Sequence, residues 1–101
     1  MKSKEVVLKV DGEEKTFKMN ALSWDDFPKL MDLLSKLNVK GEKEEDILKS
    51  LDENNMTKLM DLEYKMFKKS YPEMTEQEVK DIILENVFVL LDPLVSVNFT
   101  K

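Results

Sequence analysis

Apolar and polar residues alternate over the first part of the chain. Apolar side chains occupy every second position over residues 6–10 and again at Phe17 and Met19, and Asp11-Gly12 stands between the two runs. A period of two predicts strands, and an Asp-Gly pair between two such runs is typical of a hairpin turn. The pattern therefore predicts a β-hairpin over residues 6–19.

The length of the hairpin loop decides which side chains lie opposite one another. A loop of two residues places charged residues opposite apolar ones, whereas a four-residue loop over 11–14 pairs Leu8 with Phe17 and Val6 with Met19. Because opposed apolar side chains stabilise an antiparallel pair, we expect the longer loop. Two strands alone are marginal in water, so the hairpin must pack on helices or on another subunit.

From residue 23 onward the apolar spacing changes to three and four, which predicts helices. A first helix begins at Ser23 as N-cap and ends near Asn38, and a short one covers about 44–51. Asn54-Asn55 caps a third helix, which stops before Tyr71-Pro72 because the residue before proline avoids helical geometry. The expected fold class is α+β and mostly helical: a hairpin followed by about four helices in a small bundle, with residues 1–101 forming one domain and 23–99 its helical part.

The first predicted helix carries one apolar stripe, which we expect to face the core. Trp24 opens it and is interpreted as a core anchor, and plain core packing is the favoured interpretation of the helical methionines. The stripe consists of Trp24, Phe27, Leu30, Met31, Leu34 and Leu37.

The last predicted helix is apolar on two sides. Thr75 and Glu78 form a capping box at its start, and Pro93 is expected to kink it or to start a new turn. One face carries Val79, Ile82, Ile83, Val87 and Leu90, and the other carries Leu84, Phe88, Leu91 and Val95. Such a helix is either central in the core or shared with a partner, and the sequence leaves both open. The candidate partner-binding residues are Leu84, Phe88, Leu91, Leu94, Val95, Val97 and Phe99.

Composition argues against catalysis and for protein binding. The chain contains no His and no Cys, all 16 of its basic residues are Lys, and its net charge is −5. General acid–base and nucleophilic chemistry would have to rely on carboxylates and lysines. The acidic pairs are explained by helix starts, and the segment 52–56 lacks the glycine and the third ligand of a calcium loop. We therefore predict a protein that is not an enzyme, with no catalytic, cofactor-binding or metal-binding residues.

Charge and hydropathy also limit the classes of partner and the cellular location that we expect. Lysines alternate with acids and form no basic stripe, which argues against nucleic-acid binding. The most apolar segment, 82–99, is interrupted by Glu85, Asn86 and Asp92, which argues against a membrane span. The N-terminus lacks the apolar core of a signal peptide, so we expect a soluble protein of the cytoplasm.

The order of these segments resembles the small tail assembly chaperones of long-tailed bacteriophages and prophages. The resemblance is carried by the hairpin at 7–18, by Trp24-Asp25-Asp26-Phe27, by the segment 68–79 around Tyr71-Pro72, and by the apolar end at 95–99. It implies a chaperone that escorts the tape-measure protein and recruits tail-tube subunits in the cytoplasm of a bacterial host cell, with no active site to transfer. Some members of the family are also made as a longer frameshifted product.

Two other functions remain open. One is a structural virion or tail subunit that builds a ring through hairpin and helix contacts, and self-association is a related alternative. The other is an acidic regulatory or inhibitor protein. The regulator would need its acids concentrated on one face, and in this chain they alternate with Lys.

Overall fold

A computed structural model describes residues 3–37 and 51–99. Two strands, β1 (Ser3–Val10) and β2 (Glu13–Asn20), precede four described helices, so the expected α+β order of a hairpin and about four helices is confirmed. The helices are α1 (Phe27–Lys36), α3 (Glu53–Ser70), α4 (Glu76–Asn86) and α5 (Leu91–Phe99). Most of the short helix expected over 44–51 lies outside the described residues.

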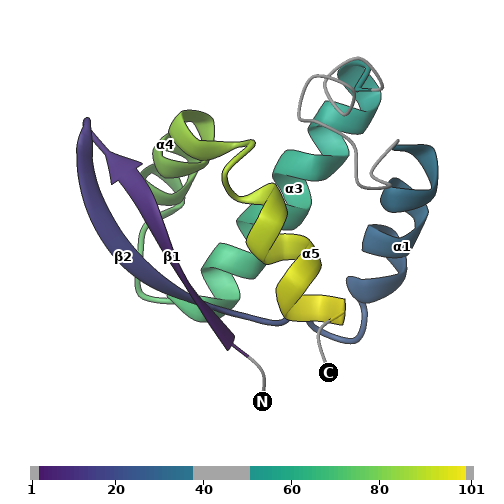
Figure 1. The fold of residues 1–101 in the computed structure, drawn as a ribbon, viewed down its shortest axis with the longest axis horizontal. Helices are drawn as coiled ribbons and strands as arrows, with labels where there is room; N and C mark the ends of the chain where they lie inside the picture. Colours follow the sequence, from purple (N-terminus) through teal and green to yellow (C-terminus); the bar gives the residue numbers. More distant parts are fainter. Residues whose placement is uncertain (1–2, 38–50, 100–101) are drawn as a thin grey trace.

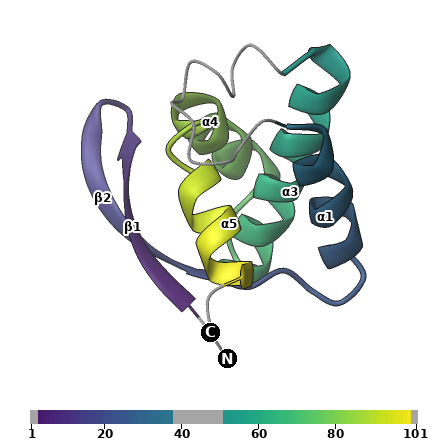
Figure 2. The same ribbon diagram turned by 45° about the vertical axis from the view of Figure 1, so that its right-hand side comes forward.

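Helix α3 is central in this arrangement. It contacts α1, α4, α5 and β2, and the hairpin curves over the opposite side of α4 and α5 from α1 (Figures 1 and 2). The core that these elements enclose includes Leu8 and Met19 from the hairpin, Leu30 and Leu33 from α1, and Phe67 from α3. The hairpin is therefore stabilised by packing on the helical layer, as a two-stranded sheet requires.

The hairpin turn has two residues, so the expected four-residue loop is wrong. Asp11 and Gly12 have φ angles of 54° and 82°, and a two-residue turn with positive φ at both positions matches the right-handed twist of its strands. Lys15 consequently lies opposite Leu8. Apolar pairing across the strands does not decide the register, because apolar side chains of the hairpin pack on the helices instead. The ring centroid of Phe17 lies 5.2 Å from that of Phe67 in α3.

Helix α1 begins later than the sequence pattern indicated. Its N-cap is Asp26, and the Ser23 hydroxyl donates to the Asp26 carboxylate at 2.9 Å instead of capping the backbone. Pro28 explains the shift, because a proline is tolerated in the first turn but not in the interior that a start at Ser23 would give it. The stripe is correspondingly displaced: Leu33 is fully buried, whereas Met31 is half exposed.

Helix α3 ends before Tyr71-Pro72 and α4 begins after Thr75, as the sequence indicated, but only one of the two N-caps was predicted. The capping box of Thr75 and Glu78 is present in full. At the start of α3, however, the cap is Asp52, whose carboxylate accepts from the backbone N–H of Asn55 at 2.7 Å. Asn54-Asn55 therefore lies in the first turn of α3 rather than before it.

The two-sided last helix is in fact two helices, α4 and α5, bent by 102°. Asn86 stands at the bend and is buried: its Nδ2 donates to the carbonyls of Ile82 and Lys9, and its Oδ1 accepts from the Lys9 N–H at 2.9 Å. Pro93 in the first turn of α5 could not continue α4 without losing a backbone hydrogen bond. The bend turns part of the second apolar face into the core, since Leu91 is buried there, and Leu94 in α5 is buried as well.

Candidate protein-binding surface

The predicted partner-binding residues do not form one surface. Leu84 on α4 is 65% exposed and Phe99 at the end of α5 is 41% exposed, and the two lie on different helices. Phe88 and Val95 are half buried. The other three, Leu91, Leu94 and Val97, are buried in the interior.

This placement changes what a mutation in α5 reports. Leu91 is only 9% exposed, so an aspartate there would place a charge in the core and destabilise the fold. Loss of binding after such a change, or after deletion of 91–101, would not identify an interface. Phe99 is the member of the predicted set on α5 that is open to solvent.

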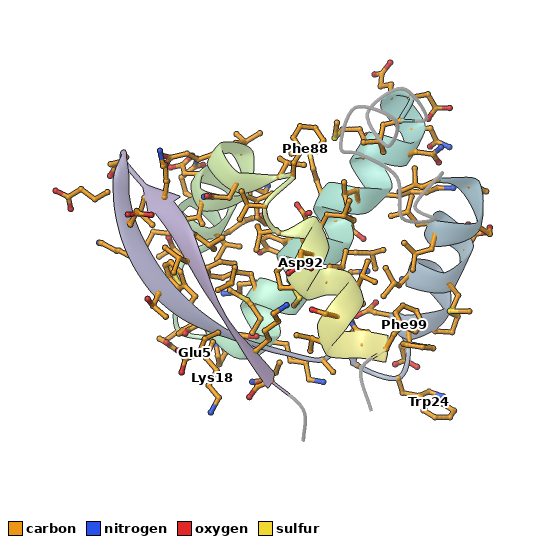
Figure 3. All side chains as sticks on the ribbon, viewed as in Figure 1. Glu5, Lys18, Trp24, Phe88, Asp92 and Phe99 are labelled. Carbon is orange, nitrogen blue, oxygen red and sulfur yellow. The ribbon has the colours of Figure 1, made fainter. Side chains whose placement is uncertain are left out.

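Trp24 is the most exposed large apolar side chain among the described residues. It is 91% exposed, so its interpretation as a core anchor is wrong. It precedes the N-cap of α1 and lies in a turn, where it is not on the buried face of any helix. Figure 3 shows its indole directed away from the protein. Pro28 is the sequence signal that could have placed Trp24 outside the helix.

Trp24 belongs to an aromatic surface formed by both ends of the helical part. The Phe27 and Phe99 rings lie 5.4 Å apart at an interplanar angle of 50°. Trp24 and Phe27 line a shallow hollow of about 410 Å³, together with Ala21, Leu22, Pro28 and Asn98. We call Trp24, Phe27 and Phe99 the aromatic patch, because Phe27 lines the hollow with Trp24 and is in ring contact with Phe99.

Polar contacts hold the two sides of the aromatic patch together. The Asn98 Oδ1 accepts from the Leu22 N–H at 2.8 Å, while its Nδ2 donates to the Leu94 carbonyl, so α5 is tied to the segment that leads to Trp24. On the other side, Asp26 forms an ion pair of 3.3 Å with Lys65 of α3. Partial burial opposes the ionisation of Asp26, but the Ser23 hydroxyl and Lys65 lower its pKa below the ordinary value. The backbone on both sides of Trp24 is thus fixed while the indole remains free.

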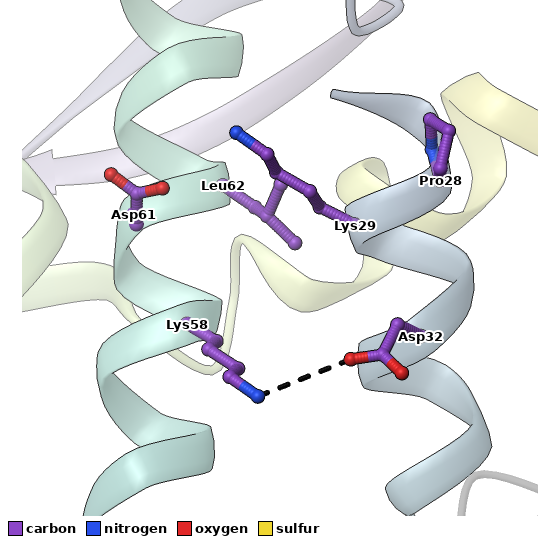
Figure 4. A pocket seen from close by; sticks show the side chains of 6 residues that line it. All are labelled: Pro28, Lys29, Asp32, Lys58, Asp61 and Leu62. Carbon is purple, nitrogen blue, oxygen red and sulfur yellow. Dashed lines mark ion pairs between the residues drawn. The ribbon is translucent and has the colours of Figure 1, made fainter. Parts of the chain in front are cut away.

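A second hollow, of about 320 Å³, lies between α1 and α3 (Figure 4). Each charged residue that lines it has an ion-pair partner. Asp32 lies 3.9 Å from Lys58, which also lines the hollow, and 3.1 Å from Lys36, which does not; Asp61 and Lys29 pair with Lys65 and Asp26 outside the lining, at 3.2 and 3.6 Å. Exposed pairs of this kind contribute little stability and leave no surplus of one charge. This hollow is therefore a weaker candidate than the aromatic patch.

A third hollow, of about 390 Å³, lies between α3 and α4. Met60, Tyr64 and Leu84 give it an apolar floor, and the ion pair of Glu76 with Lys80, at 2.9 Å, lies at its edge. Leu84 is its one strongly exposed apolar residue. Leu84 is thus the predicted partner-binding residue that lines this α3–α4 groove.

Glu63 in α3 is the buried acid that the sequence analysis missed. Its side chain is fully buried, and neither carboxylate oxygen has a hydrogen-bond partner among the described residues. Burial raises the pKa of Glu63 to about 9, so the group is neutral at pH 7. The signal was present in the spacing, because Glu63 is four residues after Leu59 and four before Phe67, on the core face of α3.

Over 3–37 and 51–99, acidic residues form no group of three or more that could hold a metal ion. Within the same residues, no single helix has both the length and the apolar character needed to cross a membrane. Helices α4 and α5 meet these two criteria only as a pair, and the pair is bent by 102°.

Comparisons with known protein-family models, with curated proteins and with solved structures find no match.

Proposed function

We propose that this chain is a non-enzymatic protein-binding module and that the aromatic patch is its contact surface. The observation that carries the proposal is the 91% exposure of Trp24 beside two further aromatic side chains. Burying an aromatic side chain is among the largest contributions that a single residue makes to an interface, and Trp is enriched among the residues that dominate binding energy. Fixed backbone around an exposed indole reduces the ordering cost of binding.

We further propose that the partner process is phage tail assembly. The support is the resemblance of the hairpin, the Trp24–Phe27 segment and the Tyr71-Pro72 segment to tail assembly chaperones. In that role the chain would escort the tape-measure protein and recruit tail-tube subunits. Trp24 and Phe27 belong both to the resemblance and to the aromatic patch, so one surface serves both parts of the proposal.

Co-purification tests both parts. A tagged chain is expressed with a tape-measure protein encoded beside its gene, and the retained tape-measure protein is compared between wild type, a Trp24→Ala/Phe99→Ala variant and a Leu84→Ala variant. We expect the aromatic double variant to lose retention and Leu84→Ala, on the α3–α4 groove, to keep it. Undiminished retention by a folded double variant would refute the patch as the contact surface. Loss with Leu84→Ala alone would assign binding to the groove instead.

A structural tail subunit is the second candidate, and the hairpin favours it. The described sheet has two strands, so each strand is an edge that can pair with another chain. A ring-forming subunit would give a closed oligomer of defined mass when purified alone. Sedimentation velocity over a range of concentrations distinguishes it from a chaperone, which we expect to be monomeric, dimeric or polydisperse.

A further inference from the structure

The aromatic patch has an acidic neighbour without a partner. Asp25 follows Trp24 directly, is exposed, and forms no ion pair or hydrogen bond with any described residue. The adjacent charges are engaged: the Asp26 carboxylate accepts from Ser23 and pairs with Lys65, and Lys29 lies 3.6 Å from Asp26. The unbalanced charge beside the indole is therefore negative.

The size of the aromatic patch limits what can occupy it. Its largest exposed side chains are those of Trp24 and Phe99, and a single aromatic side chain buries roughly 150–250 Å² at most. A stable interface between folded proteins buries about 800 Å² on each partner. The exposed aromatic side chains thus supply only part of such an area, which suits contact with one short segment of a partner.

Resting on the proposed function, we propose that the partner segment bears a Lys or Arg side chain next to an apolar one. The apolar side chain enters the hollow lined by Phe27 and Pro28. The cation lies on the face of the Trp24 indole and pairs with the Asp25 carboxylate. A cation over Trp is attracted by the ring electrons, and a neighbouring carboxylate adds a charge-assisted hydrogen bond.

Trp24 is the single tryptophan of the chain, so its fluorescence reports directly on the patch. The probes are two synthetic 18-residue amphipathic peptides, one of leucine and lysine and the other of leucine and glutamate. Each is titrated into the full chain, into Asp25→Asn and into Glu14→Gln. Glu14 is exposed on β2, so both variants lose one negative charge and only one of them loses it beside Trp24.

We expect the lysine peptide to shift Trp24 emission to the blue and the glutamate peptide to leave it unchanged. Asp25→Asn should weaken binding of the lysine peptide three- to tenfold, and Glu14→Gln less than twofold. Equal binding of both peptides, or equal effects of the two substitutions, overturns the proposed cation site. A blue shift on concentrating the protein alone, or on adding anionic lipid vesicles but not the peptide, overturns it in favour of a second copy or a membrane surface.

The peptide titration and the co-purification experiment can fail independently. If the peptides leave Trp24 unaffected while Trp24→Ala/Phe99→Ala still abolishes retention of the tape-measure protein, the patch binds a segment without a cation. If neither experiment gives an effect, both proposals fail.

Discussion

The ring of Phe27 lies against the ring of Phe99, with 5.4 Å between their centroids. One residue starts α1 and the other ends α5, so this contact joins the two ends of the helical part of the chain. The contact lies at the surface, and the indole of Trp24 stays exposed to solvent. Other residues form the buried core. The fold and the candidate surface can therefore be tested separately.

Truncation of Trp24 should leave the stability of the protein almost unchanged. An exposed side chain contributes little to the free energy of unfolding, so we expect Trp24→Ala to change it by less than about 0.5 kcal/mol. Leu30→Ala, in the fully buried interior, should cost about 3 kcal/mol. Urea denaturation followed by circular dichroism compares the two. Free access of acrylamide to the Trp24 fluorescence provides an independent check, and a shielded indole would contradict the structure.

Replacement of Glu63 should remove a pH dependence of stability. The pKa of Glu63 is about 9 in the folded protein and 4.5 is its ordinary value, so the folded state retains a proton that the unfolded state has lost. Stability due to this group is full below pH 4.5 and decreases as the pH rises toward 9, by at most about 1.4 kcal/mol for each pH unit. Denaturation at pH 5, 7 and 9 should show this decrease in the wild type and not in Glu63→Gln.

Glu63→Met should also stabilise the protein at pH 7, by about 1–3 kcal/mol, because it removes a buried carboxyl group that forms no hydrogen bond with any residue in 3–37 or 51–99. Glu73→Gln, at an exposed acid, is the matched control and should keep the pH dependence of the wild type. A wild type whose stability does not change between pH 5 and 9 would show that Glu63 is hydrated or paired in solution.

Loss of the Asn86 side chain should destabilise the junction of the hairpin with α4. Asn86→Ala leaves the Lys9 N–H and carbonyl without the partner they have in the structure, which should cost about 2 kcal/mol. Asn54→Ala, at an exposed position in the first turn of α3, serves as the control. The measurement is the urea midpoint, and amide hydrogen exchange at Lys9 should accelerate in Asn86→Ala alone.

The capping box of α4 should contribute measurably to stability. Thr75→Ala removes the hydroxyl that accepts from the Glu78 N–H, and we expect a loss of about 1 kcal/mol. Hydrogen bonds from the Thr75 backbone and hydroxyl lower the pKa of Glu78, so its contribution is present above its ordinary pKa and is lost as the pH falls through the lowered value. The stabilities of wild type and Thr75→Ala should therefore converge only in part at low pH, because the bond from the Thr75 hydroxyl to the Glu78 carboxylate weakens on protonation while the bond that the hydroxyl accepts from the Glu78 N–H does not titrate. Thr57→Ala, inside α3, should show no such convergence.

The features of the fold that could be predicted from the sequence are those set by residues close together in the chain. The alternation over 6–19 indicated the hairpin, Tyr71-Pro72 marked the end of α3, and Thr75 with Glu78 marked the start of α4. Each of these signals acts within a few residues, so it does not depend on what packs against the element. The absence of His, Cys and Arg is likewise independent of tertiary structure, since it limits the available side-chain chemistry in any fold.

Tertiary structure decided where apolar surface remained exposed. The sequence showed two apolar faces on the last helical segment, but only the bend at Asn86 turned Leu91 and Leu94 inward and left Leu84 and Phe99 outside. Likewise, a hydropathy pattern treats every tryptophan as core material, and the exposure of Trp24 follows from where α1 begins relative to the rest of the bundle. Burial is a property of the whole arrangement, because a side chain is covered only when an element distant in sequence packs over it.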